Sequence, residues 1–171
     1  MADFSPAFEK MIRHEGGFNL ENVEHDIGGL TYAGITKKYH PEWQGWKIID
    51  RGDMENPNLT QMVRDHYKST FWKQCKGDKI DNQKIAESIF DFSVNAGSRT
   101  AGKLAQIVVD ATPDGVIGPK TLEKLNDCDE ELFISKFALA KVARYVEICR
   151  RNPVQKKFLL GWINRTMGEL S

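Results

Sequence analysis

The sequence predicts a mostly α-helical protein with one small β-hairpin near residues 24–35. Apolar residues recur at helical spacing over most of the chain, whereas residues 18–36 mix short apolar positions with glycines, as turns and short strands do. The 171 residues include nine Phe, four Trp and four Tyr. These side chains are sufficient for a hydrophobic core, so we expect a folded domain and not a disordered chain.

The first helix is expected to begin at Ser5-Pro6 and to end at Gly16-Gly17. Serine caps a helix, proline fits its first turn, and glycine adopts the left-handed backbone that ends it. Glycine-rich turns over residues 28–34 then predict the hairpin. Residues 37–58 contain several prolines and glycines, and we expect short helices and loops there.

The remaining helices are bounded by capping residues, glycines and prolines. The helix expected over residues 81–94 is apolar nearly all round, so it should be the buried central helix. Its Asp91 would be a buried charge that needs a partner, and Arg99 is a candidate. We expect the other helices over residues 60–72, 98–109, 119–125, 129–150 and 153 onward, with Thr60, Asp81 and Asp129 or Asp127 as N-caps.

Charge and composition exclude several classes of protein. Lysine and arginine (24) balance aspartate and glutamate (24), whereas nucleic-acid-binding proteins normally show a basic excess. No apolar run approaches the roughly 18 residues of a membrane span. The first residues lack the basic and apolar regions of a signal peptide, so we expect synthesis in the cytoplasm. The three cysteines form no CxxC pair, and we expect reduced thiols.

Glu15 is the first candidate catalytic residue. It lies one turn after Met11 and Ile12 and in the last turn of its expected helix. The negative end of the helix dipole and partial burial both favour a protonated carboxyl group there, as a general acid near neutral pH requires. A solvated residue at a helix end is the alternative interpretation.

Asp26 and Thr31 follow at the beginning of the glycine-rich hairpin. A turn from a helix end into a hairpin can place a second carboxylate and a hydroxyl opposite the first carboxylate. Two carboxyl groups on either side of a gap are the arrangement that cleaves a glycosidic bond. The alternative interpretations are an Asx turn before the glycines for Asp26 and a residue that simply favours a strand for Thr31.

Three segments resemble one known family. Residues 15–18 (EGGF) and 26–36 (DIGGLTYAGIT) resemble the signature of glycoside hydrolase family 108, the N-acetylmuramidases of phage and bacterial genomes, some of which are called secretion activator proteins. The resemblance continues over residues 90–97 (FDFSVNAG). Residues 113–121 (PDGVIGPKT) look like the peptidoglycan-binding half of such proteins. The stretch Asn22–His25 departs from the usual family pattern, which has Pro and Asp there.

The resemblance implies a lysozyme-like fold with Glu15 as the catalytic acid. It also implies that Asp26 and Thr31 are the second carboxylate and the threonine that positions water. Tyr32, Ser93 and Asn95 would contact the sugar, although an aromatic residue is more often part of a core, and Asn95-Ala96-Gly97 is also a common helix end.

The sequence therefore predicts a hydrolase of the β-1,4 bond between N-acetylmuramic acid and N-acetylglucosamine. We expect a catalytic part over residues 1–95 and a helical, peptidoglycan-binding part over residues 96–171, packed as one body. We expect peptidoglycan strands as partner, no metal or other cofactor, and a monomer. As a prophage-type endolysin, the protein would act on the wall after holin-type release or cell lysis. A non-catalytic wall-binding or secretion-associated protein and a lytic transglycosylase are the alternatives.

Overall fold

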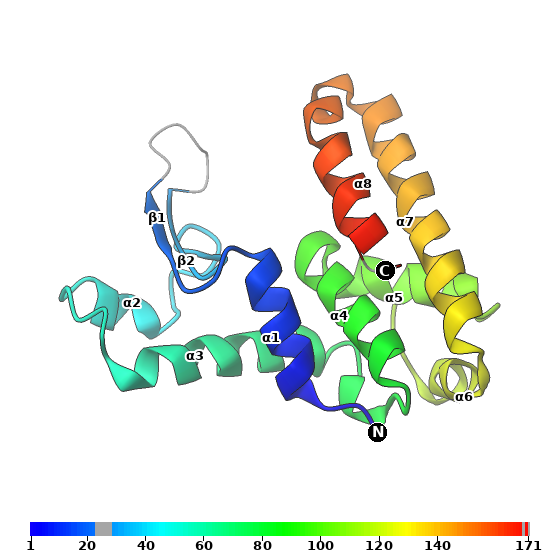
Figure 1. The fold of residues 1–171 in the computed structure, drawn as a ribbon, viewed down its shortest axis with the longest axis horizontal. Coiled ribbons are helices and arrows are strands. Elements are labelled where there is room, and N and C mark those ends of the chain that lie inside the picture. Colours follow the sequence, from blue (N-terminus) through cyan, green and yellow to red (C-terminus); the bar gives the residue numbers. More distant parts are fainter. Residues whose placement is uncertain (23–28, 169, 171) are drawn as a thin grey trace. The chain divides into compact units, whose positions relative to one another are not determined.

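The computed structural model describes residues 1–22, 29–168 and 170 (Figure 1). Over these residues the chain is mostly helical with one three-stranded antiparallel sheet, which confirms the predicted fold class. It divides into two compact units, residues 3–73 (the N-terminal unit) and residues 1–2 with 74–171 (the C-terminal unit). The expected functional division at residue 95 stays a prediction, because a compact unit and a functional part need not coincide.

Helix α1 (Phe4–His14) opens the N-terminal unit. Its N-cap is Asp3 and not Ser5 as predicted, because the Asp3 carboxylate accepts the Ser5 backbone N–H at 2.9 Å. The helix ends as predicted, since Gly16 and Gly17 both have positive φ. One face of the helix is buried and consists of Phe4, Ala7, Phe8, Met11 and Ile12.

The sheet has the order β1 (Leu20–Asn22), β2 (Leu30–Tyr32), β3 (Ile35–Thr36). It begins earlier than the predicted hairpin, and residues 23–28 lie outside the described part of the chain. Strands β2 and β3 are joined by Ala33 and Gly34, with φ of 48° and 78°. A two-residue turn with two positive φ angles matches the right-handed twist of a hairpin.

Two helices complete the N-terminal unit, α2 (Gly45–Ile49) and α3 (Pro57–Tyr67), and a π-helical turn extends α3 to Trp72. Helix α3 begins earlier than predicted from Thr60. The Asn56 side chain accepts the Asn58 backbone N–H at 3.0 Å, and Pro57 takes the first helical position.

The C-terminal unit is helical. Its helices are α4 (Gln83–Ala96), α5 (Ser98–Val108), α6 (Pro119–Asp127), α7 (Glu130–Arg151) and α8 (Leu159–Gly168), with 3-10 turns at Gly77–Lys79 and Pro153–Phe158. Figure 1 shows α7 and α8 running antiparallel as neighbours. Helix α4 is its buried centre, as predicted, and packs on α5 and α7. Asn82, one residue after the predicted Asp81, caps α4, whereas Asp129 caps α7 as one of the two predicted alternatives.

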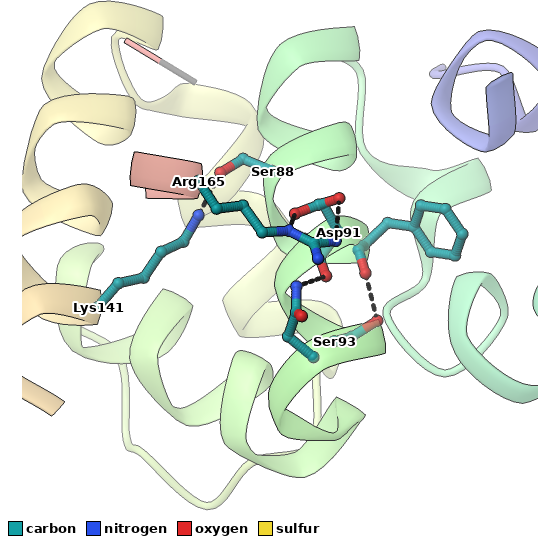
Figure 2. A network of polar contacts seen from close by, with 7 residues as sticks. Ser88, Asp91, Ser93, Lys141 and Arg165 are labelled. Atoms are coloured by element: carbon teal, nitrogen blue, oxygen red, sulfur yellow. Dashed lines mark hydrogen bonds and ion pairs between the residues drawn. The ribbon is translucent and has the colours of Figure 1, made fainter. Parts of the chain in front are cut away.

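Asp91 of α4 is held by Arg165 of α8 and not by Arg99 (Figure 2). Asp91 is only 6% exposed, and its carboxylate accepts two guanidinium hydrogen bonds, of 3.0 and 2.9 Å. Such a fork is the geometry in which a buried carboxylate is best compensated. Arg99 packs beside the Gly115 turn instead. In the described part of the chain, no helix is both long and apolar enough to cross a membrane.

Candidate active site

Glu15 lies where α1 ends and the chain turns toward the sheet. It is the C-cap residue, and its backbone N–H bonds to the carbonyl of Met11 at 3.1 Å. Its side chain is half-buried. This is the position that the sequence predicts, at the negative end of the helix dipole.

The Glu15 carboxylate packs against the turn between β2 and β3. A methyl group added at Gly34 would come within 3.2 Å of Glu15 Oε2 and would overlap the Tyr67 hydroxyl. That hydroxyl is buried and donates a hydrogen bond of 2.8 Å to the carbonyl of Ala33. Glycine at position 34 therefore lets three groups from distant segments meet: the carboxylate, the turn and the phenol.

Thr31 lies in the middle of β2 and pairs with a residue on each side. The register places it opposite Glu21 of β1 and Thr36 of β3, and the Thr31 hydroxyl lies 3.3 Å from that of Thr36. Residues directly opposite in a sheet point to the same face. Glu21 is thus an exposed carboxylate on the face of Thr31, and the sequence interpretation missed it. Antiparallel pairing across the hairpin is the signal that identifies it.

Tyr32 points to the other face of the sheet and is only 4% exposed. Its ring stacks on Trp43, with centroids 6.2 Å apart. Desolvation raises the pKa of the Tyr32 phenol above its ordinary value. Its predicted contact with sugar stays a prediction, and this geometry gives the ring a role in the core. Asp26, the predicted second carboxylate, lies outside the described residues.

Trp43 also contacts a pair of histidines that the sequence interpretation did not single out. The rings of His40 and His66 meet edge to face at 4.6 Å, and His66 lies 6.4 Å from Trp43. Desolvation, and secondarily the charge of His40, lower the pKa of His66 to about 4. Burial also lowers the pKa of His40. His66 is therefore uncharged near neutral pH.

The other two predicted sugar contacts, Ser93 and Asn95, belong to α4 in the C-terminal unit. Ser93 is fully buried, and its hydroxyl donates to the carbonyl of Phe90 at 2.7 Å, so a sugar would reach it only after α4 rearranged. Asn95 is exposed at the end of α4 and lines a cavity together with residues of α7 and α8. Both roles stay predictions, and the geometry favours Asn95.

Comparison with models of known families shows to which family the chain belongs. The model described as glycosyl hydrolase 108 matches residues 8–97, more than half of the chain. The chain belongs to the glycosyl hydrolase 108 family. A second model, described as a predicted peptidoglycan domain, matches residues 97–167 of this glycosyl hydrolase 108 protein. No curated protein matches it.

A solved structure supports the same fold. This glycosyl hydrolase 108 protein is similar to SagA of Brucella abortus, with a TM-score of 0.75 and 26% sequence identity. The similarity covers 98% of this chain and 91% of SagA. Together, the family and the peptidoglycan domain identify a lysozyme-like protein that acts on peptidoglycan.

Proposed function

We propose that the protein hydrolyses the β-1,4 bond between N-acetylmuramic acid and N-acetylglucosamine. In this proposal Glu15 donates a proton to the glycosidic oxygen as that bond breaks. Asp26 stabilises the positive charge that develops on the sugar, and Thr31 orients the attacking water. The route to the wall, by holin-type release or by lysis of the cell, is part of the same proposal.

The position of Glu15 is the observation that carries the proposal. A general acid for this reaction must be partly sheltered from water and positioned by the groups that surround it. Glu15 meets these requirements, since it follows the last residue of α1 and packs against the turn at Gly34. It does so in a chain whose family is one of glycoside hydrolases.

The decisive variant is Glu15→Gln, which keeps the size of the side chain and removes the proton that the acid must donate. We expect it to fold as the wild type and to lose at least 100-fold in the rate at which a peptidoglycan suspension clears, the order of magnitude that a general acid contributes. Glu42→Gln is the matched control, because Glu42 is an exposed glutamate of the same unit. Full clearing by Glu15→Gln would contradict the proposal.

Mass spectrometry of the products separates the alternative functions. Hydrolysis releases reducing ends, whereas a lytic transglycosylase releases anhydro ends that lack one water. A wall-binding protein without activity would sediment with peptidoglycan and release neither product. If the wild type released anhydro ends, or bound peptidoglycan without releasing any product, the proposed hydrolysis would be wrong.

A further inference from the structure

A cavity of about 270 Å³ lies in the C-terminal unit between the end of α4 and the α7–α8 pair. Its walls include Asn95 of α4, Arg144 and Tyr145 of α7, and Trp162 and Arg165 of α8. At roughly 30 Å³ per water molecule this volume equals about nine waters. The volume is close to the lower end of small-molecule pockets, roughly 300 Å³, so we expect a ligand of about one substituted sugar unit.

The two arginines of this cavity differ in how their charges are compensated. Arg165 is held by the buried carboxylate of Asp91 through two hydrogen bonds (Figure 2). Arg144 is half-buried and forms no hydrogen bond or ion pair with the described residues. A guanidinium group offers five N–H donors in a fork that fits a carboxylate. Among the described residues, none pairs with the Arg144 guanidinium, so the cavity presents this cation to a ligand.

Two further polar groups of the cavity are available. The Asn95 amide nitrogen donates to the carbonyl of Asp91 at 3.1 Å, while its side-chain oxygen accepts nothing from the described part of the chain. Likewise, the indole N–H of Trp162 has no hydrogen-bond partner among the described residues. The rings of Trp162 and Tyr145 lie 5.2 Å apart and form an apolar wall. The negative face of such rings attracts the C–H groups of a sugar.

We propose that this cavity binds one N-acyl amino sugar unit of peptidoglycan that carries a carboxylate. Arg144 binds the carboxylate, the Asn95 oxygen accepts the acyl N–H, and the Tyr145–Trp162 wall contacts the sugar ring. The carboxylate belongs either to the lactyl group of the sugar or to the peptide attached to it. The inference rests on the proposed function in one respect, that the wall polymer is the substrate.

The residues of this cavity come from both segments of the chain that match a family model. Asn95 falls within residues 8–97 of the glycosyl hydrolase match, whereas Arg144 and Trp162 fall within residues 97–167 of the peptidoglycan domain. A larger cavity of about 660 Å³ lies beside Gln106 in the same unit. No aromatic residue is among the described residues that line it, so it lacks a wall for a sugar ring.

NMR titration of the full chain tests the proposal, with N-acetylmuramic acid, N-acetylmuramoyl dipeptide and N-acetylglucosamine as probes. We expect the Trp162 indole signal, assigned from Trp162→Phe, to shift, and at least one acidic probe to bind tenfold or more tightly than N-acetylglucosamine. Tighter binding of N-acetylmuramic acid assigns the carboxylate to the lactyl group, and tighter binding of the dipeptide assigns it to the peptide.

Arg144→Gln should remove the preference for the acidic probes, and Arg144→Lys should retain part of it. Arg150→Gln, an exposed arginine of the same helix outside this cavity, should keep the preference. Equal binding of acidic and neutral probes, unchanged binding by Arg144→Gln, or shifts confined to residues 106–124 would overturn the proposal. The clearing assay with Glu15→Gln tests the proposed hydrolysis, whereas this titration tests the cavity. A negative result in one experiment therefore does not change the interpretation of the other.

Discussion

At the residue scale, the candidate acid depends on a glycine in another segment. Gly34 has a φ of 78°, and its missing side chain leaves the space that the Glu15 carboxylate and the Tyr67 hydroxyl occupy. Backbone conformation and close approach therefore both require glycine at this position.

We expect Gly34→Ala to lower the free energy of unfolding by about 2 to 5 kcal/mol. Left-handed backbone costs an alanine about 1 to 2 kcal/mol, and overpacking against Glu15 and Tyr67 adds about 1 to 3 kcal/mol. Because the methyl group displaces Glu15, the clearing rate should also fall at a temperature where the variant is folded. Urea unfolding and the clearing assay measure the two effects.

Gly52→Ala is the matched control for this substitution. Gly52 has a φ of 77°, but no described atom lies within 4 Å of an added methyl group. It should lose about 1 to 2 kcal/mol of stability from the backbone alone and keep its clearing rate. If the two variants lost stability and activity equally, Gly34 would have no special role at the site.

The position of Glu15 at the end of a helix was predictable from the sequence, whereas its surroundings were not. The helix spacing and the two glycines that follow it act locally, so they can be read from neighbouring residues. Tyr67 reaches the turn across 34 residues of chain, and Glu21 meets Thr31 only through strand register. The partner of Asp91 shows the same limit, because Arg165 is 74 residues away whereas the predicted Arg99 is eight.

At the scale of elements, sequence patterns predicted most helices but misplaced several of their first residues. Asp3, Asn56 and Asn82 cap three helices in place of Ser5, Thr60 and Asp81. Several capping residues stand close together in each case, and only the backbone conformation selects among them. The contact between His40, just before α2, and His66 of α3 could likewise not be predicted from the sequence, because it arises from the packing of separate elements.

Because His66 is partly buried beside His40, we expect the free energy of unfolding to decrease in acid. The pKa of His66 is lowered from 6.5 to about 4, so the unfolded chain takes up a proton more readily than the folded chain. Stability should therefore fall as the pH drops from about 6.5 to 4. We expect a loss of about 1 to 2 kcal/mol, reduced by solvent screening because the ring is partly exposed.

Urea unfolding of the wild type and His66→Phe at pH 7 and pH 4.5 measures this loss. The variant should lose less stability than the wild type over that interval, because it lacks the group that protonates on unfolding. His14→Gln removes an exposed histidine and should follow the wild type. If His66→Phe showed the full pH dependence, another group would be responsible.

At the scale of the whole molecule, a net charge of zero conceals an uneven distribution. Residues 136–171 contain eight basic and two acidic residues, whereas the rest of the chain has an acidic excess. Two of those arginines are already paired, Arg151 with Glu147 and Arg165 with Asp91. Exposed lysines such as Lys156 and Lys157 remain to attract an anionic polymer.

We therefore expect binding to peptidoglycan to weaken several-fold between about 50 and 500 mM salt, since exposed charges are screened over roughly 10 Å at 0.1 M. Sedimentation of the Glu15→Gln protein with peptidoglycan measures this without digestion of the polymer. The double change Lys156→Glu and Lys157→Glu should weaken binding at low salt and flatten its salt dependence. The same change at Lys47 and Lys73, exposed lysines of the N-terminal unit, should do neither. If binding did not depend on the salt concentration, or if both double substitutions weakened it equally, the C-terminal charges would not be responsible for binding to the wall.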